Sequence, residues 1–258
     1  MFKTILFIFL SINTLNAQAQ KISEQEKQIV TDTIQKKDDT HDFKFKHLII
    51  PTVLIGYGII GIESDQLKLF NTEIKEEVNE NIDEKITIDD FLLYLPAASV
   101  YGLNAIGIKG KHNLKDRTII LGTSYLLMSV SVLSLKSITK VERPDGSGNN
   151  SFPSGHTATA FAGAEFLWQE YKDVSVWYGI SGYIVAVGTG AFRIYNDKHW
   201  LTDVAAGAGI GILSTKVAYW INPWIQDKIF KSKEKNSMST IAPFYNGKQF
   251  GIGLLKQF

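Results

Sequence analysis

The sequence of 258 residues contains no cysteine. This absence excludes disulfide bonds, metal sites built on thiolates and catalysis by a cysteine nucleophile. Lysine and arginine number 27 against 26 aspartates and glutamates, which gives a formal net charge of +1. Because nucleic-acid-binding domains carry a clear excess of basic residues, this balance argues against a nucleic-acid partner. The length favours a single domain of moderate size.

Apolar residues are gathered in blocks along the chain. Residues 91–108 and 118–135 are each eighteen residues without a charged side chain, and residues 174–192 are nineteen. Runs of this length match membrane-spanning helices. Two more apolar segments, 155–171 and 204–220, contain charged residues, and we expect them inside a helical bundle. Buried helices of an exported soluble domain are the alternative to membrane spans.

The two ends of the chain differ from this apolar part. Residues 1–19 resemble a secretory signal peptide, with a small-x-small cleavage site at Ala17–Ala19, although an uncleaved anchor is the alternative. Residues 20–46 are polar with mixed charge and predict a flexible lead-in. Residues 226–258 predict a basic tail followed by a small β-hairpin on an Asn246–Gly247 turn.

A short apolar segment and an acidic segment precede the first long block. Residues 47–62 are uncharged but contain Pro51 and three glycines, so we expect that they do not fully cross a membrane. Residues 63–90 hold ten acidic side chains against three lysines. Within them, residues 73–86 predict an amphipathic surface helix.

Three polar clusters lie at the edges of the apolar segments. The first runs from Lys136 to Arg143–Pro144, the second is Pro153–His156, and the third runs from Arg193 to Asp203. Together they supply three cations, two imidazoles, one carboxylate and a Ser154–Gly155 turn. Phosphate oxygens suit the bidentate fork of arginine, and lysine adds a point charge. These clusters therefore predict a site that binds a phosphate ester.

The two histidines of these clusters can divide the work of breaking that ester. One imidazole attacks phosphorus while the other protonates the leaving oxygen. Asp203 lies four residues after His199, so a helix would place both on one face and let the carboxylate fix the imidazole tautomer. Ser154 is a favourable N-cap, and the free backbone N–H groups of the helix after it would face the phosphate.

The combined pattern, Lys-x6-Arg-Pro, Pro-Ser-Gly-His and Arg-x5-His-x3-Asp, resembles the type 2 phosphatidic acid phosphatase superfamily over roughly residues 90–222. That superfamily includes bacterial lipid phosphatases, class A acid phosphatases and vanadium haloperoxidases. Its usual serine before the arginine of the third cluster is Phe192 here. The resemblance implies His199 as nucleophile, held by Asp203, and His156 as the acid that then activates water. It also implies five phosphate-binding residues: Lys136, Arg143, Ser154, Gly155 and Arg193.

We therefore predict an all-α bundle of about six core helices, in which residues 47–225 form a phosphatase domain that needs no metal and no cofactor. Lipid phosphates are the expected substrates if membrane helices surround the site, and small soluble phosphomonoesters are expected if they do not. A vanadate-dependent haloperoxidase and a non-enzymatic membrane scaffold or phosphate-binding protein remain as alternatives. The oligomeric state is left open.

Charged residues outside the apolar blocks predict an orientation. The loop 109–117 and the tail 227–235 are both rich in basic residues, which favours the cytoplasmic side of a membrane. The polar clusters would then face the periplasm from a bacterial inner membrane, with residues 20–90 on the same side. A soluble periplasmic protein is the alternative.

Overall fold

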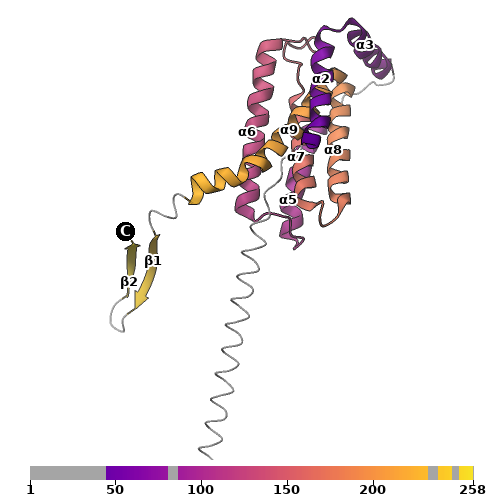
Figure 1. The fold of residues 1–258 in the computed structure, drawn as a ribbon. Helices are drawn as coiled ribbons and strands as arrows, with labels where there is room; N and C mark the ends of the chain where they lie inside the picture. Colours follow the sequence, from indigo (N-terminus) through magenta and orange to yellow (C-terminus); the bar gives the residue numbers. More distant parts are fainter. Residues whose placement is uncertain (1–44, 81–86, 232–237, 246–249, 258) are drawn as a thin grey trace, which may run out of the picture. The chain divides into compact units, whose positions relative to one another are not determined.

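The structure is a computed structural model that describes residues 45–80, 87–231, 238–245 and 250–257. The described part is mostly helical, which confirms the predicted fold class at that level (Figure 1). The proposed signal peptide, nearly all of the polar lead-in and the Asn246–Gly247 turn lie outside the described residues. The predictions for them stay predictions.

The elements follow one another in a simple order. The helices are η1 (Phe45–Leu48), α2 (Ile49–Glu63), α3 (Asp65–Glu80), α4 (Asp89–Leu92), α5 (Leu95–Ala105), α6 (Leu114–Thr139), α7 (Gly155–Tyr171), α8 (Val176–Tyr195), α9 (Leu201–Ile225) and η2 (Gln226–Lys231). Two strands follow, β1 (Met238–Tyr245) and β2 (Phe250–Gln257), which pair antiparallel with Met238 opposite Gln257.

Helices α7 and α9 form the centre of the bundle. Helix α7 packs against α5, α6, α8 and α9, and α9 packs in turn against α2 and α6. An apolar cluster joins α5, α6, α7 and α9 through Val100, Ile120, Phe166 and Tyr219, all of which are buried. Alanines fill much of the rest of α7, so neighbouring helices approach it closely.

Two glycines show how close these approaches are. A Cβ atom on Gly61 of α2 would lie 2.4 Å from Thr202 of α9, and one on Gly207 of α9 would lie 2.4 Å from the main-chain oxygen of Ser154. Any larger side chain would push the helices apart. Helix α9 is thereby held between α2 and the start of α7, and this contact brings the second and third polar clusters together.

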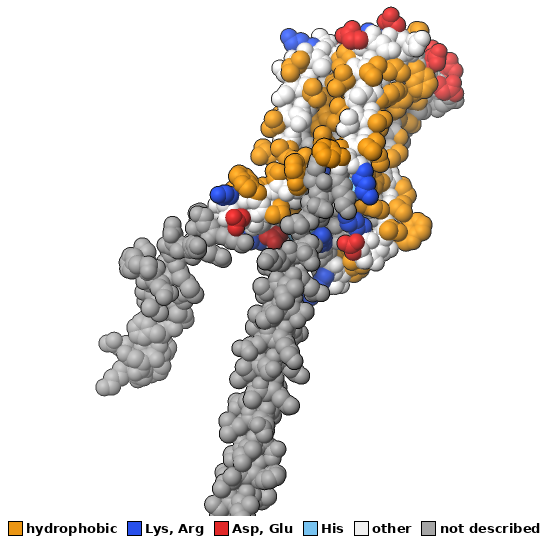
Figure 2. All heavy atoms as spheres, in the orientation of Figure 1, with side chains coloured by type: hydrophobic (Ala, Val, Ile, Leu, Met, Phe, Trp, Pro, Cys, Tyr) orange, Lys and Arg blue, Asp and Glu red, His pale blue; other side chains and the backbone are white. Residues whose placement is uncertain are grey.

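Three helical segments among the described residues are long and apolar enough to cross a membrane: Phe45–Glu63, Leu114–Thr139 and Leu201–Ile229. Large apolar side chains are exposed on α2, α6 and α8. Figure 2 shows such side chains spread over the side of the helical part. These features suggest a membrane protein.

The structure corrects two expectations about these segments. Residues 47–62 belong to a candidate span of 19 residues, because η1 extends α2 at its N-terminal end. Residues 91–108 form parts of two helices, α4 and α5, instead of one span. Pro96 lies in the first turn of α5, where its missing N–H is tolerated, and it could not continue the hydrogen bonds of α4.

Two further expectations are adjusted. The segment 204–220 was expected inside the bundle, and it lies in the third candidate span, of which 67% is buried against 17% and 22% for the first two. One helix therefore combines a span-like length with a central place in the core. The expected surface helix over 73–86 is α3, which begins at Asp65, eight residues earlier. Residues 81–86 lie outside the described part.

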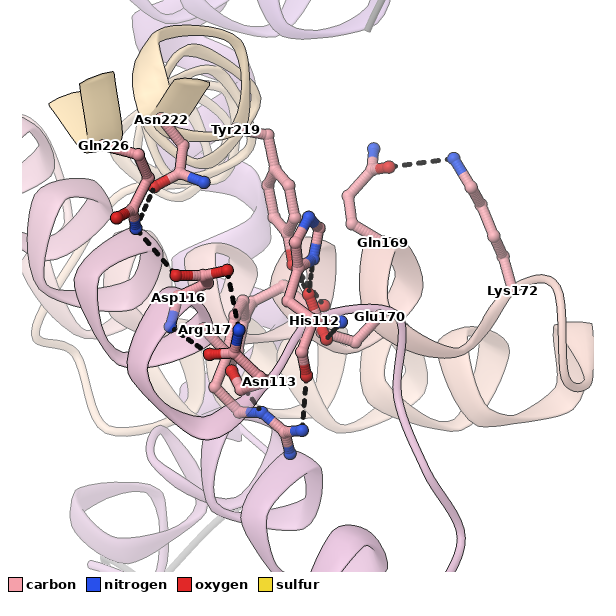
Figure 3. A network of polar contacts seen from close by, with 11 residues as sticks. His112, Asn113, Asp116, Arg117, Gln169, Glu170, Lys172, Tyr219, Asn222 and Gln226 are labelled. Atoms are coloured by element: carbon pink, nitrogen blue, oxygen red, sulfur yellow. Dashed lines mark hydrogen bonds and ion pairs between the residues drawn. The ribbon is translucent and has the colours of Figure 1, made fainter. Parts of the chain in front are cut away.

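A polar network joins the start of α6 to the end of α7 (Figure 3). Glu170 accepts hydrogen bonds from the main-chain N–H of His112 at 3.0 Å and from the Tyr219 hydroxyl at 2.7 Å, and His112 Nδ1 lies 2.7 Å from its carboxylate. Arg117 donates to the main-chain oxygens of His112 and Asn113. The loop before α6 is thus fastened to α7 at the end opposite the polar clusters.

Candidate active site

The third polar cluster is built where α8 ends and α9 begins. The sequence predicted His199 and Asp203 on one helix, and this is wrong: α9 begins at Leu201, so His199 lies in the connection before it. The Asp203 carboxylate accepts a hydrogen bond from the Trp200 N–H at 3.0 Å, and this cap starts the helix after the histidine. The same oxygen, Oδ2, lies 3.6 Å from His199 Nδ1, which is too long for a direct hydrogen bond.

Ser151 bridges this pair. Its hydroxyl oxygen lies 2.5 Å from Asp203 Oδ2 and 3.4 Å from His199 Nδ1. An ionised carboxylate can only accept, so Ser151 must donate its single proton to Asp203 and can only accept from the imidazole. The proton of the neutral ring therefore belongs on Nδ1. Nε2 keeps its lone pair.

Burial sets the charge of His199. Its side chain is 2% exposed, and this desolvation lowers its pKa to about 4. The nearby cations Lys136 and Arg193 add to the lowering, while Asp203 opposes it. The ring is therefore neutral at pH 7, which is the form that a nucleophilic histidine requires.

The loop between α6 and α7 joins the first cluster to the second. Lys136 Nζ donates to the main-chain oxygens of Asn150 and Ser151, the latter at 3.2 Å. Arg143 Nε donates to Asn150 Oδ1 at 2.7 Å. Both cations thus bind oxygens of the same loop. An incoming phosphate would offer oxygens of the same kind.

Arg193 of α8 forms a buried ion pair. Its NH1 atom lies 2.6 Å from Asp89 Oδ2, and the two side chains are 9% and 1% exposed. Arg193 Nε is buried and has no hydrogen-bond partner among the described residues. One edge of the guanidinium is therefore anchored by the protein while its Nε–H remains available to a ligand.

His156 lies in the first turn of α7, where Ser154 is the N-cap as predicted and accepts from the Thr157 N–H. The Nε2 atom of His156 lies 2.8 Å from Asp90 Oδ1. Burial lowers the pKa of His156, Arg193 lowers it further, and Asp90 opposes both. Both histidines therefore lie within electrostatic reach of the same guanidinium.

One group of side chains could hold a metal ion. Asp89, Asp90 and His156 offer ligand atoms that all lie within 4.8 Å of one another. Asp89 is already neutralised by Arg193, whose positive charge would oppose a cation at this place. The arrangement suits an imidazole that exchanges a proton better than it suits a metal ligand.

Sequence reasoning missed three residues of this region: Asp89, Asp90 and Ser151. Ser151 directly precedes the second cluster, and the two aspartates directly precede an apolar segment. A carboxylate that becomes buried needs a cationic partner, so an acidic pair at such a boundary was the available signal.

The comparisons with known proteins concern the same region. A family model described as the PAP2 superfamily matches residues 117–227. This PAP2 region contains all eight site residues predicted from the sequence, whereas Asp89 and Asp90 lie before it.

Individual relatives extend beyond the PAP2 region. A lipid A 1-phosphatase of Porphyromonas gingivalis is 35% identical over 173 residues, which cover 63% of this chain and 38% of the relative. The chain thus spans less than two fifths of that protein. Two solved structures are also similar. LpxE of Aquifex aeolicus has 26% identity and a TM-score of 0.44, covering 58% of this chain and 94% of its own. A PAP2-type phosphatidylglycerolphosphate phosphatase of Bacillus subtilis has 23% identity and a TM-score of 0.48. The match covers 70% of this chain and 98% of that structure's chain.

Proposed function

We propose that this chain is a phosphatase that hydrolyses phosphate monoesters of lipids through a phosphohistidine on His199, without a metal ion. The observation that carries the proposal is the arrangement around the buried His199 ring. Ser151 and Asp203 occupy its Nδ1 side, and the low pKa keeps the ring neutral. Nε2 then keeps its lone pair as a base, and the cations Lys136 and Arg193 act electrostatically on the same ring.

The reaction has two steps in this proposal. The Nε2 lone pair of His199 forms a bond to phosphorus while the bond from phosphorus to the ester oxygen breaks, and His156 gives a proton to that oxygen. Water then attacks phosphorus, His156 takes a proton from it, and the bond from phosphorus to Nε2 breaks. Because Asp90 holds His156 Nε2 here, the leaving oxygen must replace this carboxylate at the imidazole.

In this proposal the charge of the phosphoryl group is stabilised by three cations and by the start of α7. Arg193 is held by Asp89 and would bind a phosphoryl oxygen through its free Nε–H. Lys136 and Arg143 would exchange their bonds to Asn150 for phosphoryl oxygens. The Ser154–Gly155 turn at the start of α7 supplies backbone N–H groups and the positive end of the helix dipole.

A lipid phosphate is the substrate class that the surroundings favour. Three candidate spans flank the site, and the relative named lipid A 1-phosphatase shares 35% identity over 173 residues. A phosphate on a lipid head group could reach the clusters from the membrane surface while its acyl chains stay in the bilayer. Small soluble esters would not need the exposed apolar sides of α2, α6 and α8.

We place the site on the periplasmic face of a bacterial inner membrane. The basic loop before α6 is fastened to the end of α7, away from the clusters, so the positive-inside rule puts that end in the cytoplasm. Helix α2 runs antiparallel to α9, with Gly58 against Ala206 and Gly209 against Pro51. Phe45 would then lie at the cytoplasmic end as well, which replaces the expectation that residues 20–90 all lie outside. Cysteine substituted at Gly148, but not at Asn113, should react with an impermeant thiol reagent in intact spheroplasts. The reverse labelling would overturn this orientation.

Purified protein in detergent tests the reaction itself. We expect phosphatidic acid to be hydrolysed in the presence of a chelator, and alkaline-quenched enzyme to carry phosphate on His199 by mass spectrometry. Strict dependence on a divalent metal would contradict the mechanism. Faster turnover of a soluble phosphomonoester than of phosphatidic acid would contradict the lipid substrate class, and binding of phosphate without any turnover would favour a scaffold.

A further inference from the structure

A cavity on the flank of the bundle lies away from the polar clusters. It has a volume of about 330 Å³ and lies between η1 with the start of α2 and the facing sides of α7, α8 and α9. Glu165 in its lining is ten residues along α7 from Gly155, a distance of about 15 Å. Lys216 is fifteen residues along α9 from Leu201, about 22 Å away. The cavity is therefore separate from the proposed active site.

A buried carboxylate holds a lysine at this cavity. Glu165 is 2% exposed and accepts hydrogen bonds from Gln169 Nε2 at 2.6 Å and from the Tyr183 hydroxyl. Lys216 Nζ donates to the same carboxylate at 2.7 Å, and this side chain is 20% exposed. An ammonium group has three donors, so Lys216 is fixed by one of them and can offer the other two to a ligand.

The charges that a ligand can reach in this cavity are positive. Lys46 of η1 is exposed and lines the cavity together with Lys216. Glu165 is the acidic residue of the lining, but it is buried and already accepts from three donors. An anion with oxygen acceptors therefore suits this cavity, because ammonium groups bind such oxygens strongly.

Apolar side chains form the rest of the wall. Ile50 is 66% exposed and belongs to the candidate span Phe45–Glu63. The Trp168 ring packs so tightly on α8 that a Cβ atom on Gly179 would lie 2.2 Å from it. A free anion gains nothing from such a wall, whereas a lipid can place its phosphate on the lysines and its acyl chains along the apolar side. Basic pockets between membrane helices bind anionic head groups in this way.

We propose that this cavity binds the head group of an anionic phospholipid, with phosphatidylglycerol as the type, at a site that takes no part in catalysis. Its phosphodiester would contact Lys46 and Lys216, and its chains would lie along Ile50 and Trp168. In the proposed orientation the start of α2 is at the cytoplasmic end, so the lipid belongs to the cytoplasmic leaflet. The inference rests on the membrane location and not on the phosphatase reaction.

Counting bound lipids tests the cavity. The full chain in detergent is titrated with phosphatidylglycerol or with phosphatidylcholine of the same acyl chains, and bound molecules are counted by native mass spectrometry. The first lipid is anionic, and the second carries a compensating choline cation. We expect the first molecule of phosphatidylglycerol to bind about 25-fold more tightly, since each lysine contributes about fivefold near an anionic head group.

Two variants and two controls locate the bound lipid. Lys46→Met removes an exposed cation and should lower the preference about fivefold. Lys216→Gln keeps a donor for Glu165 and should act similarly, so the double variant should show almost no preference. Lys109→Met changes an exposed lysine of the basic loop that does not line the cavity, and it should keep the full preference. Lys136→Met does the same at the polar clusters.

Several results would overturn the lipid site, and none of them depends on turnover. Equal binding of the two lipids would do so, as would an equal loss of preference in Lys46→Met and Lys109→Met. A preference lost in Lys136→Met but kept in Lys46→Met would place the lipid at the polar clusters instead. Glycerol 3-phosphate has the charge without acyl chains, so displacement of the bound lipid by an equal concentration of it would contradict a lipid ligand. Lys46→Met decides the question by itself if Lys216→Gln lowers the thermal unfolding midpoint.

Discussion

The two ends of the helical bundle use buried polar side chains in opposite ways. At the end where α6 begins, Glu170 has three hydrogen-bonding contacts and fastens a loop to α7. At the end where α6 finishes, buried atoms are left unpaired. Among the described residues, four buried side-chain atoms lack a partner, and three of them, on Asn71, Arg193 and Asp197, lie at this end.

The paired groups at the first end form a stabilising network, whereas the unpaired atoms at the second end are typical of a binding site. An unpaired buried polar atom costs about 1–3 kcal/mol, so a chain that pairs its groups well at one end gains nothing in stability by leaving them open at the other. Unpaired buried atoms are expected where a bound ligand supplies the missing hydrogen-bond partner. Substitutions at matched positions of the two ends should therefore have different consequences.

The largest expected effect comes from the two histidines. His199→Ala should lower turnover of phosphatidic acid by roughly 10⁴-fold or more, since the residue that forms the covalent bond is lost. His112→Ala, at the other end, should leave turnover within about twofold and lower the thermal unfolding midpoint, because it removes the Glu170 contact. Similar losses of turnover in both variants would contradict the difference in role between the two ends of the bundle.

The buried arginines come next. Arg193→Lys loses the fork that joins Asp89 to a phosphoryl oxygen, and kcat should fall about 10²- to 10³-fold. Arg117→Lys is the matched change at the other end, where the guanidinium donates to the main-chain oxygens of His112 and Asn113. It should lower stability and leave kcat almost unaltered. Equal kcat in the two variants would contradict a catalytic role for Arg193.

A smaller effect is expected from Ser151→Ala. Without the bridging hydroxyl the Nδ1 proton of His199 loses its acceptor, and loss of one hydrogen bond corresponds to about tenfold in rate. Glu170→Gln serves as control: it should lower the unfolding midpoint more than Ser151→Ala does, with turnover retained. If Ser151→Ala keeps full activity across pH 5 to 8, the bridge does not set the tautomer.

The low pKa of His199 makes stability depend on pH. Between its ordinary pKa of 6.5 and about 4, the unfolded chain binds a proton on this ring and the folded chain does not, so stability falls as pH falls through this window. The total is about 3 kcal/mol from this group, or about 1.4 kcal/mol per pH unit. His199→Gln should flatten the decline of the unfolding midpoint between pH 6.5 and 4. An unchanged slope would mean that the ring is not held neutral.

The smallest effect concerns Asp90. Its carboxylate raises the pKa of His156 against the effects of burial and Arg193, so Asp90→Asn should lower that pKa. The proposed acid would then lose its proton at lower pH, and the alkaline limb of the kcat/KM profile should move toward acid. A limb that stays in place would indicate that another group donates the proton.

The sequence predicted the parts of the site that depend on local spacing. Ser154 as an N-cap and the clusters around Lys136 and Arg193 each lie within one segment, so their pattern is visible in the chain. The ion pair between Arg193 and Asp89 joins residues 104 positions apart, and no local pattern marks it. The break between α4 and α5 was signalled by Pro96 but hidden by the uncharged run around it.

The start of α9 was missed for a different reason. A spacing of four residues from His199 to Asp203 is compatible with a helix, but it is equally compatible with a carboxylate that caps the helix behind the histidine. Tertiary contacts decide between the two, since the Asp203 main-chain oxygen also accepts from the Ser154 N–H at 3.0 Å. Composition predicted one of the three candidate spans, the one around residues 118–135, whereas residues 47–62 and 204–220 were not expected to be spans and residues 91–108 are divided between α4 and α5.

The contact between α2 and α9 also determines the order in which the protein can be completed. Roughly 150 residues separate Gly58 from Ala206, which at about 5–20 residues per second means a delay of roughly 7–30 seconds during synthesis. Helix α2 can persist through it, because a helix satisfies its own backbone in lipid, but its glycine face has no partner. Thr202 and Asp203 arrive with α9 itself, so the insertion of α9 both closes the bundle and assembles the pocket. A nascent chain therefore lacks the proposed phosphatase site until its last long helix is in place.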